Sequence, residues 1–231
     1  MFDEVLKGLT DFRRTKSYDL VTATPLIAWY LLGLVRQLPL AWTRMTDLVR
    51  GRISLLDFLQ LVALTGSFVL MFLLIYLLVT RRTPERRMHG VWPRLVAGGG
   101  TFLGNAILLL EPVRLTLTLQ IAADVLIIAG AVGSLVAASW LGRSFALMPE
   151  ARQLVTNGPY ALIRHPLYAA EMVGIAGLML QFQQPWAVIL GGLVFALQYW
   201  RTVFEERVLQ EAYPNYRLYR ARTWRFVPYV F

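Results

Sequence analysis

The stretch LLDFLQLVALTGSFVLMFLLIYLLV, residues 55–79, limits the possible folds more than any other part of the chain. After Asp57 it contains no aspartate, glutamate, lysine or arginine. A helix needs roughly 20 mostly apolar residues to cross the hydrocarbon core of a bilayer, and this run is long enough. The stretch therefore predicts a transmembrane helix and not a segment of a soluble core.

The rest of the chain repeats this apolar pattern. Of its 231 residues, 57% are hydrophobic and only 16% are charged, whereas about a quarter are charged in a soluble domain. We expect an all-α polytopic membrane protein with about five or six transmembrane helices. The other apolar segments are residues 20–35, 95–113, 115–141, 167–183 and 185–204. The last two are joined by QFQQP, which predicts a C-terminal helical hairpin.

Positive charge is concentrated between the apolar segments. The net charge is +9, and 18 of the 23 lysines and arginines lie in residues 1–19, 80–94, 142–166 and 201–231. Because positively charged loops stay in the cytoplasm, these segments are predicted to lie inside the cell. Such clusters match anionic lipid headgroups, so we expect the bilayer as a partner and no nucleic acid.

The first apolar segment, residues 20–35, fits this charge rule less well. It is short and contains Pro25. Four arginines follow it on the outer side: Arg36, Arg44, Arg50 and Arg52. The segment therefore either spans the bilayer or lies in its interface.

Several features exclude particular chemistries. Cysteine is absent, which excludes disulfides and thiolate nucleophiles. The two histidines, His89 and His165, lack the spacing of a metal motif, so we expect no metal. The stretch MFDEVLKGLTDFRRTK has acidic residues ahead of its positive ones, which is not the pattern of a signal peptide.

Small and polar residues inside the apolar segments have two interpretations. A group of glycines predicts close helix packing, because a dinucleotide loop would need a preceding strand. These glycines are Gly98, Gly99, Gly100 and Gly104. Asp124 and Asn105 either line a cavity or bridge helices.

The stretch LVTNGPYALIRHPLYAAE, residues 154–171, gathers polar residues at a predicted membrane boundary. Its Gly-Pro pair predicts a turn, and Pro166 is typical of the first turn of a helix. Three side chains then lie near a helix N-terminus, where free N–H groups favour an anionic group. They are Tyr160, Arg164 and His165. Alternatively, the stretch is only a positive loop in which Glu171 pairs with Arg164.

The second polar stretch, YWRTVFEERVLQEAYPNYRLYRARTWRFVP, covers residues 199–228. Arg201 and Glu205 lie four residues apart and share one helix face. They form either a surface ion pair or part of a site that faces the first stretch across the hairpin. The tyrosines at helical spacing fit packing, interfacial anchoring or a ligand pocket. They are Tyr213, Tyr216 and Tyr219.

Together the two stretches resemble the isoprenylcysteine carboxyl methyltransferase family, whose superfamily includes the phospholipid methyltransferases. The family pattern is GxY, RHPxY, a helical hairpin, an Arg four residues before Glu-Glu, EExxL followed by tyrosines, and RxxP. In this chain GPY, RHPLY, Arg201, EERVL and RFVP occur in that order over about residues 140–228.

The resemblance implies S-adenosyl-L-methionine as the cofactor, in a cytoplasmic pocket between the RHP loop and the C-terminal helix. Residues 91–231 would form the methyltransferase core, and residues 1–90 would be N-terminal helices of uncertain role. The candidate catalytic residues are Arg201, which would face the substrate, and Glu205, which would hold a polar group of the cofactor. The other candidate cofactor-binding residues are Arg152, Gln153, Leu154, Val155, Tyr160, His165, Pro166, Leu167 and Tyr168.

The resemblance also implies an integral protein of a bacterial inner membrane that acts on a lipid or lipidated acceptor. The acceptor is either an isoprenylcysteine-like carboxylate or a lipid headgroup. A carboxylate is already ionised, whereas an amine would need a base such as Glu205, Glu206 or His165. A nicotinamide-dependent reductase of the sterol reductase type is an alternative, because such enzymes have an RHPxY-like element. A non-enzymatic protein that binds lipid, haem or a partner is another.

Overall fold

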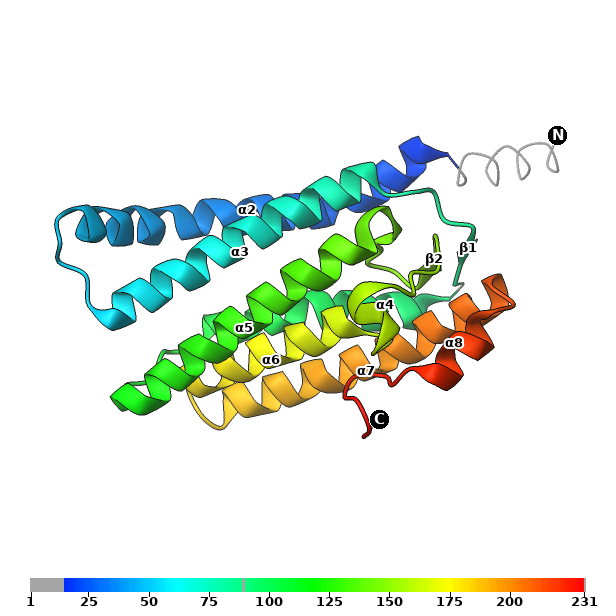
Figure 1. Cartoon of the computed structure of the whole chain (residues 1–231). Coiled ribbons are helices and arrows are strands. Elements are labelled where there is room, and N and C mark those ends of the chain that lie inside the picture. Colours follow the sequence, from blue (N-terminus) through cyan, green and yellow to red (C-terminus); the bar gives the residue numbers. More distant parts are fainter. Residues whose placement is uncertain (1–14, 89, 231) are drawn as a thin grey trace.

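The structure, a computed structural model, describes residues 15–88 and 90–230. Its helices run along one common direction and form a bundle (Figure 1). They are α2 (Lys16–Val49), α3 (Leu55–Thr80), α4 (Val91–Phe102), α5 (Leu117–Leu141), α6 (Pro166–Gln181), α7 (Trp186–Ala212) and α8 (Tyr216–Arg222). Short 3-10 turns are η1 (Leu103–Leu109), η2 (Gly142–Ser144) and η3 (Gly158–Ala161). Strands β1 (Arg86–Arg87) and β2 (Glu150–Ala151) pair antiparallel.

This architecture confirms the predicted all-α membrane fold. Among the described residues, four helices are long and apolar enough to cross a membrane, namely α2, α3, α5 and α7. Many of their large apolar side chains face outward, including Trp42, Phe72 and Val132. Such a surface suits lipid and not water. The prediction of five or six spans exceeds this number because α6 and α4 are shorter than the roughly 20 residues that a span needs.

The first apolar segment is a much longer helix than predicted. Helix α2 begins at the N-cap Thr15, continues through Pro25 and Pro39, and ends at Val49. At 1.5 Å per residue, its 34 residues cover roughly 50 Å, more than the hydrocarbon core. The outer arginines therefore fall at or beyond the far membrane surface, where Arg44 pairs with Asp57 at 2.5 Å.

The segment predicted at residues 95–113 is interrupted. Helix α4 gives way to the 3-10 turn η1 at Leu103, within the stretch that holds the glycines. Glycine lowers helix stability, which explains why the α-helix does not continue. The packing interpretation holds for Gly99 and Gly100, because a Cβ there would lie 3.1 Å from Leu197 and 3.2 Å from Gln198. Helix α4 thus packs closely on α7.

Helices α5 and α6 cross at small residues. A Cβ on Gly130 would lie 2.5 Å from the Cα of Gly174, so the two backbones touch. Asp124 bridges the same helices, because its Oδ1 accepts from Gln120 at 3.1 Å and from Gln181 at 2.7 Å. Asn105 instead lines two cavities. Asp124 therefore bridges helices, and Asn105 lines cavities.

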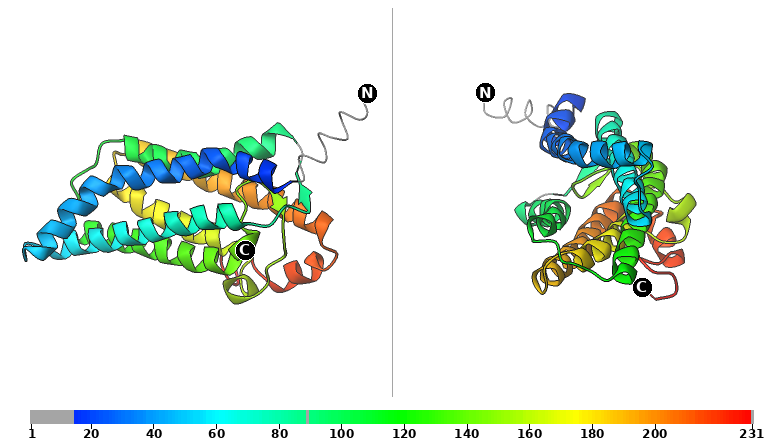
Figure 2. Two further views of the ribbon diagram at one scale, coloured as in Figure 1. Left: turned by 90° about the horizontal axis from the view of Figure 1, so that it is seen from above. Right: turned by 90° about the vertical axis from the view of Figure 1, so that its left-hand side faces the viewer.

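The irregular segments gather at one end of the bundle, which we call the loop end (Figures 1 and 2). It holds the start of α2, the strands β1 and β2, the loop before α6, and α8. The opposite end holds the α2–α3 and α6–α7 turns. Both polar stretches of the sequence therefore meet at the loop end. His89 lies outside the described residues.

Candidate functional site

A cavity at the loop end is enclosed by the two polar stretches, and we call it the loop pocket. Its walls come from β2 and the residues after it, the loop before α6, the first turn of α6, α7 and α8. Nine predicted site residues line it: Arg152, Gln153, Leu154, Val155, Tyr160, His165, Leu167, Tyr168 and Glu205. Pro166 and Arg201 are not among the lining residues. The cavity measures about 50 Å³.

The turn that begins the loop needs a glycine. Gly158 has a φ of +60°, and a Cβ there would lie 2.4 Å from the indole of Trp140. Tyr160 follows in η3 and is buried. Pro166 is the first residue of α6, as predicted. A proline fits this position because an N–H group there would have no partner within the helix. The loop is therefore held tightly against the end of α5.

Glu206 ties this loop to the C-terminal stretch. Its carboxylate accepts from Arg164 Nε at 3.0 Å and from Arg225 Nη2 at 3.0 Å, and His165 Nε2 lies 3.2 Å away. The side chain is only 3% exposed. Both of its oxygens are engaged, so Glu206 is not available as a base. It is a positioning residue, and the sequence analysis did not assign it that role.

Backbone hydrogen bonds reinforce this tie. Arg164 N donates to Trp224 O at 2.7 Å, and His165 N donates to Arg225 O at 3.1 Å. The last residues of the second stretch thus run beside the RHP loop, with a parallel bridge between Ile163 and Trp224. This pairing explains why an RHP element and an RxxP element occur together in one sequence.

Glu205 differs from its neighbour because it faces the loop pocket. Its Oε2 accepts a hydrogen bond from the Tyr168 hydroxyl at 2.9 Å, and its side chain is 26% exposed. No lysine or arginine of the described chain lies within ion-pair distance of it. Its carboxylate can therefore accept from a bound ligand.

Tyrosines form much of the remaining wall. Tyr219 donates its hydroxyl to the Tyr160 carbonyl at 2.8 Å. The Tyr216 hydroxyl is buried and has no hydrogen-bond partner among the described residues. Burial, with the charge of Glu205, raises the pKa of Tyr160 well above its ordinary range, and burial also raises the pKa of Tyr216. These hydroxyls therefore stay protonated and can donate. Tyr213 is not part of the lining.

Arg201 does not line the loop pocket, but it contacts Tyr168, which does. Its guanidinium carbon is 4.6 Å from the centre of the Tyr168 ring, and Nη2 donates to Leu147 O at 2.9 Å. The side chain is 4% exposed, so the alternative of a surface ion pair with Glu205 is wrong. Its Nε has no partner among the described residues. One buried donor therefore remains for a ligand.

A second cavity, the inner cavity, lies deeper in the bundle. It has a volume of about 260 Å³ and is lined mainly by apolar and small residues of α2 to α7. Glu171 and Gln198 stand on its wall and share a hydrogen bond of 2.5 Å. Thr101, which accepts from Arg201 at 3.2 Å, lines it as well. Glu171 therefore bonds to Gln198 and not to Arg164, so that alternative pairing is wrong.

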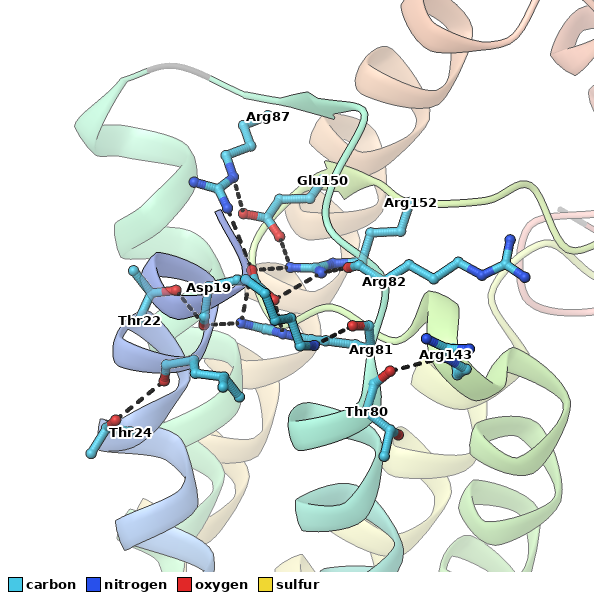
Figure 3. Close-up of polar contacts among 12 residues, drawn as sticks. Asp19, Thr22, Thr24, Thr80, Arg81, Arg82, Arg87, Arg143, Glu150 and Arg152 are labelled. Carbon is cyan, nitrogen blue, oxygen red and sulfur yellow. Dashed lines mark hydrogen bonds and ion pairs between the residues drawn. The ribbon is translucent and has the colours of Figure 1, made fainter. Parts of the chain in front are cut away.

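A second cluster of ion pairs is centred on Asp19, a residue that belongs to no motif (Figure 3). Two of its members, Glu150 and Arg152, line the loop pocket. Asp19 of α2 is fully buried and accepts from Arg81 Nε at 2.8 Å and from Arg152 Nη2 at 2.7 Å. Arg87 lies 3.4 Å away, and Arg152 also bonds to Glu150 at 2.5 Å. The Arg152 side chain thus enters this cluster, while the residues after it line the pocket.

The pKa values of two arginines in this cluster shift in opposite directions. Burial alone would lower the pKa of Arg152, but the hydrogen bonds and charges of Asp19 and Glu150 raise it above its ordinary value. Burial, together with the charge of Arg152, lowers the pKa of Arg81. The only sequence signal for this cluster was a lone aspartate immediately before an apolar segment.

Two curated bacterial proteins align with part of the chain. The cobalt-zinc-cadmium resistance protein CzcN of Cupriavidus metallidurans is 41% identical over 76 residues, which cover 32% of this chain and 35% of that protein. The nickel-cobalt-cadmium resistance protein NccN of Alcaligenes xylosoxydans xylosoxydans is 36% identical over 80 residues, covering 34% and 38%. The chain thus spans little more than a third of the length of these relatives.

A family model gives a longer match. Residues 115–216 match the phospholipid methyltransferase family. This range contains α5, the RHP loop, the α6–α7 hairpin and the Glu-Glu pair, while α2, α3 and Arg225 lie outside it. The match confirms the resemblance seen in the sequence: this chain is an integral membrane protein whose residues 115–216 match the phospholipid methyltransferase family.

Proposed function

We propose that the protein is a membrane methyltransferase that uses S-adenosyl-L-methionine and methylates a lipid or lipidated acceptor. The observation that carries this proposal is a chain of contacts between the two cavities. The Tyr168 hydroxyl bonds to Glu205 in the loop pocket, and the Tyr168 ring lies against Arg201. Arg201 in turn donates to Thr101 and Gln198, which line the inner cavity.

The loop pocket has the chemistry that the cofactor needs. When bound, S-adenosyl-L-methionine supplies a methyl group on a sulfonium cation. The rings of Tyr160, His165 and Tyr168 offer aromatic faces to a cation. Glu205 offers a carboxylate free of arginine partners, and the Tyr216 hydroxyl offers a hydrogen bond that no described residue uses. These two groups would hold the polar parts of the cofactor.

The size of the pocket adds a requirement. At about 50 Å³ it is smaller than the roughly 300 Å³ or more that is typical of small-molecule sites. Binding therefore includes an outward movement of part of the wall. The backbone of Gln153, Leu154 and Val155 would contact the cofactor, and residues His165 to Tyr168 would close over it.

The inner cavity suits the acceptor. Its apolar lining would hold a hydrocarbon chain, and the free Nε of Arg201 would bind a polar group of the head. Because methyl transfer is a displacement, holding the nucleophile in line with the methyl group can supply most of the rate increase. Arg201 and Tyr168 would perform that positioning. We place this site in the cytoplasm, on a bacterial inner membrane, because the positive segments lie at the loop end.

The names of the two curated relatives refer to metal resistance. Within the described residues, no three histidine, aspartate or glutamate side chains come together as metal ligands. The proposal therefore rests on the loop pocket and on the family match.

Calorimetric binding of S-adenosylhomocysteine to the detergent-purified protein tests the cofactor, with NADPH titrated in parallel. We expect the homocysteine compound to bind and NADPH not to bind. Glu205→Ala should weaken binding at least tenfold, because a hydrogen bond to a charged group contributes about 1.5–3 kcal/mol. Glu211→Ala is the matched control, since Glu211 is on the same helix but pairs with Arg86 at the surface. Binding of NADPH alone would make the protein a reductase and overturn the proposal.

The role of Arg201 needs a second readout. Arg201→Gln should lower methyl transfer from a labelled donor to membrane lipids at least a hundredfold and change S-adenosylhomocysteine affinity little. Retained affinity also shows that the variant is folded. Equal losses of turnover and affinity would place Arg201 in the cofactor site instead.

A further inference from the structure

A third cavity at the loop end lies outside the site described above. It is enclosed by the start of α2, the end of α3, β1, the first turn of α4 and the residues around β2, and its volume is about 200 Å³. That is more than ten times the roughly 15 Å³ that one water molecule requires. We call it the arginine cavity, because Arg81, Arg87 and Arg94 line it.

The charges around this cavity do not balance. Glu150 is the single acidic residue in its lining, against three arginines. Two residues outside the lining bond to these side chains: Asp19 pairs with Arg81 and Arg87, and Arg152 pairs with Glu150. They add one negative and one positive charge, so the excess of positive charge is unchanged. Lys16, whose ammonium donates to the Arg81 carbonyl, increases it further. This excess of positive charge favours an anionic ligand.

Arg94 leaves room for such a ligand. It is exposed, and no described residue gives it a hydrogen bond or an ion pair. Arg87 also lines the cavity, but its guanidinium pairs with Asp19 at 3.4 Å and with Glu150 at 3.2 Å (Figure 3). Arg94 can therefore turn toward a phosphate, while Arg87 contributes positive charge to the wall. Guanidinium groups bind phosphate with paired hydrogen bonds.

The floor of the cavity is apolar. Ala23 and Leu26 of α2 lie one and two turns deeper than Asp19, and Leu78 of α3 lies one turn deeper than Arg81. All three line the cavity. The lining thus changes from charged at the bundle end to apolar toward its middle. This order matches a lipid whose phosphate is at the membrane surface and whose chains point inward.

We propose that the arginine cavity binds the phosphate headgroup of an anionic phospholipid from the leaflet at the loop end. The distinction from the acceptor rests on the proposed function, which places the acceptor in the inner cavity, since none of the three arginines lines that cavity. Arg94 binds the phosphate, the positive charge of Arg87 supports it, and the apolar floor takes the first part of the acyl chains.

Equilibrium binding of labelled short-chain phosphatidylglycerol to the detergent-purified full chain tests this site, with phosphatidylcholine as the zwitterionic reference. Wild-type protein should bind phosphatidylglycerol at least fivefold more tightly. Arg94→Gln should remove most of that preference, and Arg87→Gln, which removes a charge of the wall, should remove part of it. Arg86→Gln is the matched control, because Arg86 precedes Arg87 but pairs with Glu211 at the surface, and it should keep the preference. The measurement needs no turnover, so it is independent of methyl transfer.

Two results would overturn the proposal. One is equal preference for phosphatidylglycerol in wild type and Arg94→Gln, a surface variant whose folding can be checked by its thermal midpoint. The other is binding of inorganic phosphate as tight as that of the lipid and equally dependent on Arg94. That result would assign the cavity to a free anion and not to a membrane lipid.

Discussion

The loop pocket lies between two clusters that are each centred on a single carboxylate. Glu206 gathers Arg164, His165 and Arg225, whereas Asp19 gathers Arg81, Arg87 and Arg152. Members of both clusters line the pocket. The Glu206 cluster is built entirely from the two polar stretches. The Asp19 cluster takes its carboxylate from α2 and two arginines, Arg81 and Arg87, from the segment after α3, and none of these residues belongs to a motif. The family-like site therefore depends on a part of the chain that its motifs do not reveal.

Removing the first carboxylate should have the largest effect. Glu206→Ala removes the carboxylate that Arg164, Arg225 and His165 share, and breaking a buried pair in this way costs about 3–5 kcal/mol. We expect a clear fall in the thermal midpoint of the detergent-solubilised protein. Glu211→Ala, which removes an exposed partner, should cost roughly 0–1 kcal/mol. Similar midpoints for the two variants would show that Glu206 does not hold the loop.

Asp19→Asn should have an intermediate effect, about 2–4 kcal/mol, because the amide keeps one acceptor oxygen and Glu150 still pairs with Arg152. The comparison between the clusters also predicts a change in ligand binding. Asp19 does not line the loop pocket, yet its loss should weaken S-adenosylhomocysteine binding severalfold by releasing Arg152. Unchanged affinity in a destabilised Asp19→Asn protein would show that the cluster is structural only.

Tyr216→Phe should have the smallest effect on stability. The hydroxyl is buried without a partner among the described residues, so removing it should leave the thermal midpoint unchanged or slightly raise it. S-adenosylhomocysteine affinity should fall about threefold to tenfold, since a typical hydrogen bond contributes about 0.5–1.5 kcal/mol. A lower midpoint with normal affinity would mean that the hydroxyl serves the fold and not the ligand.

Local patterns were sufficient to predict most of the fold. The apolar runs predicted the positions of the helices, and the Gly-Pro pair and Pro166 predicted the turn and the start of α6. The length of α2 was not predictable in this way, because Pro25 and Pro39 normally end a helix. In this chain the helix continues through both.

The site was predictable where residue spacing carries the information. The pairing of the two polar stretches and the position of Glu205 followed from motifs. The different roles of Glu205 and Glu206 did not follow, because neighbouring residues on a helix point about 100° apart and only the fold decides which faces the pocket. Asp19 could not be connected to Arg152, since nothing local relates residues so far apart in the chain.

The pairing of the RHP loop with the C-terminal stretch also has a consequence for biosynthesis. The bond from His165 N to Arg225 O joins residues that are distant in sequence. A ribosome adds residues one by one, so α5, α6 and α7 are synthesised before Arg225. The bond between the RHP loop and the C-terminal stretch can therefore form only after these three helices have been made. Closure of the pocket is a late step, and translation that stops before Arg225 would leave a chain in which this bond cannot form.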